Sequence, residues 1–506
     1  MKKATIVFTI SLIIAVLFIL WGVLAPHNLS VITSSIQNFL QTKLGWFYLI
    51  SASIFLIFAI YLIFSRFGNI KLGKDDEEPE YSLISWFAML FSAGMGIGLV
   101  FYGVAEPLSH YMDPPYGKPG TEDAAGTAMR YSIFHWGLHP WGIYAIIALA
   151  LAYFKFRKGA PGTISATFQP ILGDRTNGWI GKLIDIIAVF ATIFGVATSL
   201  GLGAAQINGG LHYLNHGIPN TKGIQLIIIV IVTVLFMLSA ISGLGRGIKW
   251  LSNINILFAV VLMLFLLFAG NSNFLLNYFT TTIGSYIQKL PSMSLNISPF
   301  NKHHSEWINS WTLFYWAWWI AWSPFVGTFI ARVSRGRTVR EFIIGVLLVP
   351  TIFCALWFSI FGGSGIYLER EMHIHLSQTI NTQGIEVSLF AVLSHFPWAT
   401  FTSILAIILI CTFFITSADS ATFVLAMQTT NGSLNPPNVI KIVWGVVQAA
   451  AAAVLLWSGG LTALQTASII AAFPFAIILL FMLYSLYKAF KEDKPKVKKE
   501  VKQQTA

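Results

Sequence analysis

Twelve apolar stretches, each long enough to cross a lipid bilayer, constrain the fold of this 506-residue chain more than any other feature. A transmembrane α-helix needs about 20 predominantly apolar residues. Only 10% of the residues are charged, whereas a soluble domain carries about 25%. The stretches cover residues 5–25, 45–65, 83–107, 134–154, 183–211, 224–243, 251–270, 308–332, 343–366, 400–427, 440–459 and 464–487. The sequence therefore predicts an all-α integral membrane protein with twelve transmembrane helices.

The distribution of positive charge predicts the orientation of these helices. Twelve spans place both termini on one side of the membrane, and with the N-terminus inside, 24 of the 31 Lys and Arg residues fall on the inner side. Because cytoplasmic loops carry an excess of Lys and Arg, both termini are predicted to be cytoplasmic. This asymmetry accounts for the net charge of +11 without a nucleic-acid partner, and the basic tail at 488–506 is expected to lie near anionic lipid. We interpret 5–25 as an anchor and not a signal peptide, because it lacks a small-residue cleavage site.

A run of aromatic residues lies inside the eighth apolar stretch. Trp and Tyr normally gather at membrane interfaces, but here they recur along one helical face about 100° wide. The residues are Trp311, Tyr315, Trp318, Trp319 and Trp322. Clustered π-faces in a low-dielectric cavity attract poorly hydrated organic cations such as quaternary ammonium compounds. The alternative interpretation is a Trp-rich packing face or a misplaced interfacial belt.

Two spans contain residues that interrupt a helix. The third has glycines at alternate positions, Gly94, Gly96 and Gly98, and each costs a helix about 1 kcal/mol relative to Ala. The eighth contains Pro324 followed by Gly327. Non-helical backbone at membrane depth is tolerated only where it is buried in protein or lines a wet cavity. Corresponding breaks five spans apart therefore indicate an inverted-repeat transporter with its site at the breaks, although close packing of small residues is an alternative for the glycine run.

The fourth span adds more aromatic residues. Trp136, Trp141 and Tyr144 fall within about 140° of one another on a helix and are expected to close an aromatic box with the eighth-span tryptophans. His135 and His139 have the i, i+4 spacing of metal ligands. No H-E-x-x-H frame and no neighbouring Cys or carboxylate accompanies them in the sequence, so a metal site is disfavoured.

Hydroxyl groups in the tenth span are candidates for binding a cation. Thr416, Ser417 and Ser420 share a face with Phe413, and freed carbonyls at a helix break would add hard oxygen ligands suited to Na⁺. The alternative is that these hydroxyls bond carbonyls of their own helix. Asp419 is a rare intramembrane carboxylate and is either functional or holds a neighbouring helix or a cytoplasmic Arg.

Other classes of function find little support. The chain has no G-x-S-x-G, H-E-x-x-H or Walker motif and no paired carboxylates within a span, so an enzyme is not expected. Cys354 and Cys411 lie inside predicted spans and imply neither a disulfide framework nor a metal site. We expect no cofactor. A channel remains an alternative to a transporter, and it would move its substrate without accumulating it.

Four stretches together resemble the betaine/carnitine/choline transporters, which are secondary transporters of trimethylammonium compounds. They cover residues 94–107, 134–144, 314–337 and 414–420, and the resemblance extends over nearly the whole chain. It is strongest to the Na⁺-coupled glycine betaine porters of Gram-positive bacteria. The resemblance implies two leading helices and two inverted five-helix repeats with unwound third and eighth spans, a bacterial plasma-membrane location and a homotrimer.

The resemblance also implies an organisation along the chain. Residues 1–82 hold the two leading helices and a cytoplasmic loop, and 83–270 form the first five-helix repeat. An interfacial helix and linker occupy 271–307, the second repeat occupies 308–487, and 488–506 form a basic cytoplasmic tail. The implied function is import of glycine betaine by Na⁺ symport and alternating access in osmotic stress protection, with a choline or carnitine transporter of the same family as the alternative.

Site residues follow from the matched positions. The family's aromatic box falls on Trp136, Trp141, Tyr144 and Trp319, and its substrate-contacting path residues fall on Trp318 and Trp322. The principal Na⁺ site falls on the carbonyls of Ser92, Met95 and Phe413 and the hydroxyls of Thr416 and Ser417. A second Na⁺ site would use Thr192 near Phe325, but Val196 replaces the other threonine that the family uses there. These positions are read from the printed sequence.

One glycine bears on the choice of substrate. In the family, choline porters tend to carry Asp at the last position of the Gly-x-Gly-x-Gly run, where this chain has Gly98. No Asp or Glu occurs elsewhere between Ser92 and Tyr102. An uncompensated cation is costly in a low-dielectric site. Betaine carries its own carboxylate, so the resemblance favours betaine over choline.

Overall fold

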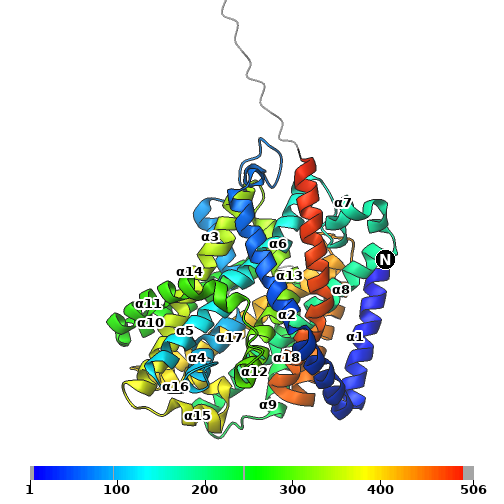
Figure 1. Cartoon of the computed structure of the whole chain (residues 1–506). Helices are drawn as coiled ribbons and strands as arrows, with labels where there is room; N and C mark the ends of the chain where they lie inside the picture. Colours follow the sequence, from blue (N-terminus) through cyan, green and yellow to red (C-terminus); the bar gives the residue numbers. More distant parts are fainter. Residues whose placement is uncertain (1–4, 95, 243–244, 494–506) are drawn as a thin grey trace, which may run out of the picture.

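The computed structural model describes residues 5–94, 96–242 and 245–493, and these residues form a bundle of helices (Figure 1). Within these ranges the only β pairing is one isolated antiparallel bridge between Lys71 and Thr338. The all-α prediction is therefore confirmed. Nine helices in the described part of the chain are long and apolar enough to cross a membrane, while the count of twelve spans and the inverted repeats remain predictions.

The helices follow the predicted stretches closely. Pro26 occupies the first turn of α2, where its missing N–H costs nothing, and the Thr5 hydroxyl caps α1 by accepting a hydrogen bond from the Phe8 amide. The longer helices are α1 (Ile6–Leu24), α2 (Pro26–Phe64), α3 (Leu83–Gly94), α4 (Ile97–Met112), α5 (Glu122–Trp136), α6 (Leu138–Ala152), α8 (Trp179–Leu214), α9 (Lys222–Ser242), α10 (Gly245–Ala269), α11 (Ser272–Ser294), α13 (Thr312–Val333), α14 (Val339–Arg370), α17 (Ala399–Gln428) and α18 (Asn438–Glu492).

Short elements connect these helices at the two ends of the bundle. They include the short α-helices α7 (Gln169–Leu172), α12 (Lys302–Ser310), α15 (Leu376–Gln383) and α16 (Ser388–Leu393). They also include a π-helical turn, η2 (Tyr153–Arg157), and the 3₁₀ turns η1 (Arg66–Asn69), η3 (Ser165–Phe168), η4 (Gly173–Asn177) and η5 (Ile385–Val387). The predicted linker at 271–307 is thus helical over α11 and the start of α12.

The third span is broken where the glycine run predicts a break. Helix α3 ends at Gly94 and α4 begins at Ile97, and Gly96 between them is extended, with φ −153° and ψ −166°. Met95 lies outside the described residues. The unwinding predicted for the third span is therefore confirmed at Gly96, whose Cβ position lies 3.6 Å from Trp322 of α13 and 3.8 Å from Ser417 of α17.

The prediction that the eighth span is unwound is wrong. Helix α13 continues through Pro324 from Thr312 to Val333. Proline cannot donate to the carbonyl four residues earlier, but the Ser323 hydroxyl donates to the Ile320 carbonyl at 2.8 Å and replaces the missing amide. A hydroxyl that satisfies the freed carbonyl allows a transmembrane helix to keep a proline without breaking.

A break that the sequence analysis did not predict lies in the fourth span. Gly137, with φ −98° and ψ −130°, separates α5 from α6. A Cβ at this position would stand 2.5 Å from the Ile133 carbonyl oxygen. The Leu138 amide, which has lost its helical partner, donates instead to the Tyr286 hydroxyl on α11 at 3.1 Å. The interruption therefore depends on the absence of a side chain and on a partner from a distant helix.

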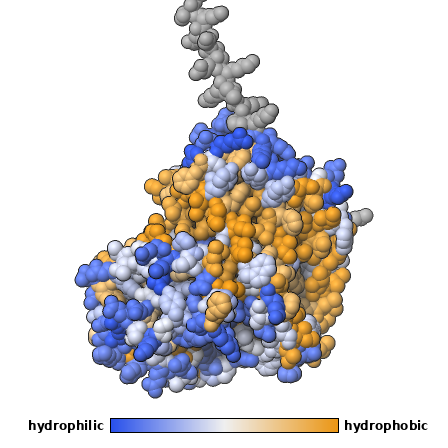
Figure 2. Space-filling model, in the orientation of Figure 1, coloured by the Kyte–Doolittle hydropathy of each residue, from blue (hydrophilic) through white to orange (hydrophobic). Residues whose placement is uncertain are grey.

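The eleventh and twelfth predicted spans form the single element α18, which changes direction at Gly460, with φ 63°. Helix α18 packs along α2 and α8, and α13 packs against α6 and α8. Figure 2 shows hydrophobic surface over the upper part and the right side of one face, with a hydrophilic cap at the top. This arrangement surrounds α4, α5, α6 and α13 with other helices and buries their side chains.

Loops predicted to be cytoplasmic join one another at the top of Figure 1. Arg157 donates to the Gly73 carbonyl at 3.1 Å, to Asp75 at 2.8 Å and to Asp493, beyond the end of α18, at 2.6 Å. Loops predicted to be outside meet at the other end, where the Trp307 indole donates to the Asp113 carbonyl at 2.8 Å. The two sets of loops are separated as the charge pattern predicts, while which end faces the cytoplasm stays a prediction.

Candidate functional site

The aromatic residues of α13 meet those of α5 and α6 in the interior. The rings of Trp136 and Trp319 lie edge to face with centroids 4.8 Å apart. Tyr144 lies 6.2 Å from Trp319, and Trp141 lies 5.6 Å from Tyr144. All four residues are at most 5% exposed. The structure thus brings together the four predicted members of the aromatic box, although their role in binding is a proposal made below.

The two predicted path residues extend this cluster along α13. Trp318 stacks on Trp319, with centroids 4.8 Å apart and an interplanar angle of 15°. Trp322 lies 6.4 Å from Trp318 and 5.4 Å from Phe325. Rings three and four residues apart share a helix face, so α13 presents a continuous aromatic surface from the box towards its C-terminal half.

Gly98 allows α4 to approach this surface. A Cβ at Gly98 would stand 2.5 Å from Cη2 of Trp318 and 3.0 Å from Cη2 of Trp136. Ordinary carbon contacts are about 3.5–4.0 Å. The absence of a side chain at position 98 therefore permits both indoles to lie against the first turn of α4.

Two polar atoms of the cluster have no hydrogen-bond partner within the described residues, and these are the Tyr144 hydroxyl and Nε1 of Trp322. In contrast, Trp319 donates to the His135 carbonyl at 2.9 Å and Trp318 to the Gly195 carbonyl at 3.3 Å. Nε1 of Trp316, whose ring stacks on His139 outside the cluster, also has no partner in the described residues. Buried donors without a partner are rare and call for an explanation. A ligand with a hydrogen-bond acceptor, such as a carboxylate, would satisfy them.

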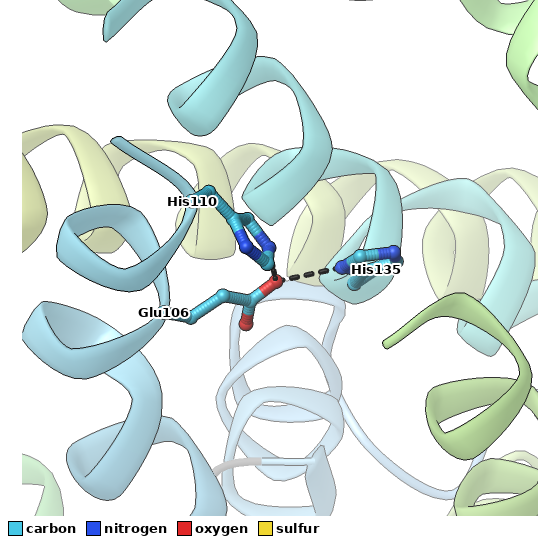
Figure 3. Close-up of side chains that lie close together, drawn as sticks. All are labelled: Glu106, His110 and His135. Carbon is cyan, nitrogen blue, oxygen red and sulfur yellow. Dashed lines mark hydrogen bonds and ion pairs between the residues drawn. The ribbon is translucent and has the colours of Figure 1, made fainter. Parts of the chain in front are cut away.

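A buried carboxylate that the sequence analysis missed lies beside the cluster. Glu106 of α4 has its Oε1 2.7 Å from Nδ1 of His135 and 3.1 Å from Nε2 of His110 (Figure 3). Its Oε2 accepts hydrogen bonds from the Trp136 indole at 2.8 Å and the Tyr315 hydroxyl at 2.5 Å. The expectation that no carboxylate accompanies His135 is therefore wrong, because Glu106 comes from another helix.

Glu106 and its two histidines are also of a kind that binds metal ions. Their ligand atoms all lie within 4.8 Å of one another, and two imidazoles with one carboxylate suit Zn²⁺. Each histidine contacts Oε1 by a hydrogen bond, so both nitrogens that face Glu106 have a partner without an ion, while Nδ1 of His110 has none in the described residues. His139 contributes nothing here, since its ring stacks on Trp316 at 5.0 Å.

The hydroxyls of α17 lie close to the break in the third span. Oγ of Ser417 is 3.8 Å from the point where a Cβ of Gly96 would stand. The Thr416 hydroxyl donates to the Thr412 carbonyl at 3.0 Å and lies 3.3 Å from the Phe413 carbonyl oxygen. It also accepts a hydrogen bond from Asn255 of α10 at 3.1 Å, a residue that the sequence analysis did not identify.

The remaining ion-site residues are placed only in part. Ser92 belongs to the last turn of α3, and Met95 lies outside the described residues. Thr192 is buried in α8 and donates to the Ala188 carbonyl of its own helix at 2.8 Å. Hydrogen bonding within the helix, the alternative interpretation of such hydroxyls, is thus observed for Thr192 and Thr416. The Thr416 oxygen also accepts from Asn255, which leaves it one further lone pair. No hydroxyl accompanies Thr192 at Val196.

Asp419 holds a neighbouring helix, as one of the predicted alternatives requires. It accepts a hydrogen bond from Ser239 of α9 at 2.9 Å. It also lines a cavity of about 520 Å³ together with Lys155, Arg332 and Phe325. Because Phe325 contacts Trp322 as well, this cavity reaches the end of the aromatic surface.

Comparison with known proteins gives a family match over residues 6–495, and that family is described as BCCT, the betaine/carnitine/choline family transporters. The glycine betaine transporter OpuD of Bacillus subtilis is 58% identical over 503 residues, which cover 99% of this chain and 97% of that protein. A probable glycine betaine transporter of Desulfitobacterium hafniense is 47% identical over 98% of this chain and 99% of its own length. An ectoine/hydroxyectoine transporter of Virgibacillus pantothenticus is 43% identical over 99% of this chain and its whole length.

Proposed function

We propose that this chain, which belongs to the betaine/carnitine/choline transporter family, imports glycine betaine across the bacterial plasma membrane as an osmoprotectant. Family membership makes it a multi-pass membrane transporter and not an enzyme. The relatives named as glycine betaine transporters, one of them 58% identical over nearly the whole length, support betaine as the substrate.

The observation that carries the proposal is the chemical match between the aromatic cluster and betaine. A trimethylammonium group binds to π-faces, and each cation–π contact contributes about 0.5–2 kcal/mol. Trp136, Trp141, Tyr144 and Trp319 offer such faces in a buried setting. The unpaired donors of Tyr144 and Trp322 suit the carboxylate at the other end of the same molecule. Because the rings contact one another, substrate entry would have to separate them.

Na⁺ coupling is the second part of the proposal. The backbone freed at the break beside Gly96 and the hydroxyls of Thr416 and Ser417 supply hard oxygens of the kind Na⁺ prefers. A cation bound there would hold α17 against the broken third span and favour substrate binding by linkage. Ser92, Met95 and Phe413 would add carbonyls. A second Na⁺ at Thr192 and Phe325 lacks a hydroxyl at Val196 and is not part of the proposal.

The transport cycle is proposed to be alternating access, in which the site opens first to one side and then to the other. The cavity lined by Phe325, Asp419 and Arg332 would be the cytoplasmic exit, since it lies on the side of the predicted inner loops. The membrane potential would drive uptake at about 2.3 kcal/mol per charge per 100 mV. We further propose contact with membrane lipid, cytoplasmic termini and a homotrimeric assembly, and no nucleic-acid partner.

The comparisons suggest three other substrates. Choline and carnitine are substrates of the same family, but choline lacks a carboxylate and would leave the donors of Tyr144 and Trp322 unpaired. Ectoine is named for a relative that is 43% identical. An unpaired buried donor costs about 1–3 kcal/mol, so choline should bind at least about tenfold more weakly than betaine.

Uptake by proteoliposomes tests the proposal. Radiolabelled betaine, choline, carnitine, ectoine and proline are each offered with an inward Na⁺ gradient and with K⁺ in its place. We expect accumulation of betaine above the external concentration only with Na⁺. Equilibration without accumulation would indicate a channel, and efficient choline uptake by the unmodified protein would contradict the assigned substrate.

A further inference from the structure

The four hydrogen bonds to Glu106 link it to the walls of the aromatic box. Its partners come from three helices, namely His110 of α4, His135 and Trp136 of α5, and Tyr315 of α13. The glutamate, both histidines and the tyrosine are fully buried. The His135 carbonyl in turn accepts the hydrogen bond from the Trp319 indole at 2.9 Å. The position of the Trp136 indole thus depends on Glu106 directly, and that of the Trp319 indole depends on it through His135.

The donors on Oε2 restrict what the residue at position 106 can be. An indole N–H can only donate, and the Tyr315 hydroxyl donates here as well, so Oε2 must act as an acceptor. No Lys or Arg side chain pairs with Glu106 in the described ranges, and the titratable groups around it are His110, His135 and the two tyrosines Tyr102 and Tyr315. Full burial opposes an ionised carboxylate, whereas the hydrogen bonds from Trp136 and Tyr315 favour one. The ionised form of Glu106 is therefore part of the proposal that follows.

We propose that Glu106 is a positioning and specificity residue for the cationic end of the substrate. This inference rests on the proposed function. Hydrogen bonds to Glu106 fix the Trp136 indole and the Tyr315 ring, and its negative charge favours a cation against the face of Trp136 in a low-dielectric interior. When the indole N–H donates a hydrogen bond to a carboxylate, the ring is polarised and its π-face becomes more negative, which strengthens a cation–π contact.

Replacing Glu106 with glutamine distinguishes the effect of its charge from the effect of its hydrogen bonds, which hold Trp136 and Tyr315 in place. In Glu106→Gln the amide oxygen can keep the hydrogen bonds from Trp136 and Tyr315, while the amide N–H₂ can donate to neutral His110 and His135. The hydrogen-bonded frame is preserved and the charge is removed. Glu106→Leu, by contrast, removes both and leaves buried donors unpaired.

The decisive probe is the carbon isostere of betaine, 3,3-dimethylbutanoate, in which a neutral tert-butyl group replaces trimethylammonium. Binding of betaine and of the isostere to purified protein is measured by tryptophan fluorescence and by competition. Glu106→Gln should weaken betaine about tenfold, roughly the value of one cation–π contact, and should leave the isostere within about twofold. Glu106→Leu should weaken both. Asp185→Asn is the matched control, because Asp185 is a buried carboxylate that bonds Ser165 away from the box.

Equal losses for betaine and the isostere in Glu106→Gln would overturn the proposal and show that the residue is only structural. Unchanged binding of both would overturn it as well. If Glu106→Gln does not fold, Tyr315→Phe supplies the test, because it removes one donor and keeps the charge, so the ratio of betaine to isostere affinity should stay at the wild-type value. A fall in that ratio would also refute the inference. Wild-type protein that fails to bind betaine would refute the proposed function instead.

Discussion

Replacing Gly98 with alanine tests whether the contact between α4 and the aromatic cluster controls substrate binding. The new Cβ would stand 2.5 Å from Trp318 and 3.0 Å from Trp136, both measured to the Cη2 atoms. The first contact is about 1 Å shorter than an ordinary carbon contact. Overpacking of this kind costs about 1–3 kcal/mol. If the rings must shift to relieve it, the Kd for betaine should rise about 5- to 150-fold.

The measurement is the betaine Kd of purified protein by tryptophan fluorescence, together with the KM for uptake by proteoliposomes. Gly126→Ala is the matched control, because Gly126 also lies in a helix, α5, and no atom stands within 4 Å of its Cβ position. We expect the control to bind betaine like the wild type. Normal folding with an unchanged Kd in Gly98→Ala would refute the idea that the two indoles need the space at Gly98.

The same contact changes the expectation for Gly98→Asp. By resemblance to choline porters, an Asp at this position should add choline transport, made sensitive to pH by the new carboxylate. Its Cβ meets the same two rings, so betaine affinity should fall at least as far as in Gly98→Ala. Comparing the two variants separates the steric effect from the charge. Choline uptake by Gly98→Asp with undiminished betaine affinity would contradict the expected clash of the new Cβ with the two rings.

Four further predictions address the box, the ion site, the inner loops and the topology. Trp319→Leu should weaken betaine binding about tenfold or more, because it removes a π-face; unchanged binding would mean that the tryptophans only pack. Thr416→Ala and Ser417→Ala should each raise the Na⁺ concentration needed for half-maximal uptake, and the idea fails if that concentration does not move. Burial opposes ionisation of Asp493, but hydrogen bonds from Arg157 and Tyr153 lower the pKa of its carboxyl below the ordinary value. The ionised carboxylate therefore stabilises the fold above about pH 4, and this stabilisation is lost as the pH falls through the lower pKa of the folded state. The melting temperatures of wild type and Asp493→Asn should differ most at pH 7, and the difference should disappear in acid. A single cysteine at Gln503, in a variant without Cys354 and Cys411, should resist impermeant thiol reagents in intact cells, and labelling from outside would contradict cytoplasmic termini.

The aromatic cluster and the first helix break could be predicted because their signals are local in the sequence. Trp322 lies four residues after Trp318 and three after Trp319 on one helix, and a glycine at every second position weakens any helix. The partners across the box follow from the same reasoning. Composition and local spacing therefore account for the all-α fold and for the aromatic cluster, whereas the individual roles in the proposed site follow from the resemblance to the family.

The errors arise where the outcome depends on a hydrogen-bond partner that helix propensity does not include. Pro324 does not break α13, because the hydroxyl of the preceding serine replaces the lost amide donor. Gly137 breaks the fourth span, where the hydroxyl of Tyr286 on α11 accepts a hydrogen bond from the freed Leu138 amide. Propensity at a single position cannot reveal either partner, since one is a choice of rotamer and the other is 148 residues away along the chain.

Glu106 was open to prediction by a different signal. A carboxylate at the end of an apolar span is rare and functional by default, and His110 follows it at i+4 on the same helix face. The stretch from Ser92 to Tyr102 holds no carboxylate, and Glu106 lies one helical turn beyond it. With Glu106 beside the box, discrimination against choline depends less on electrical neutrality than on the unpaired donors of Tyr144 and Trp322.

The continuity of α13 through Pro324 makes the two halves of the box mechanically unequal. Trp318 and Trp319 stand on one uninterrupted helix, whereas Trp136 is the last residue of α5 and is followed at once by the interruption at Gly137. A small rotation about Gly137 would swing Trp136 away from Trp319 while α13 stays straight. The box would then open by movement of α5 alone. The distance between one label on α5 and one on α13 would change, while the distance between two labels on α13 would not.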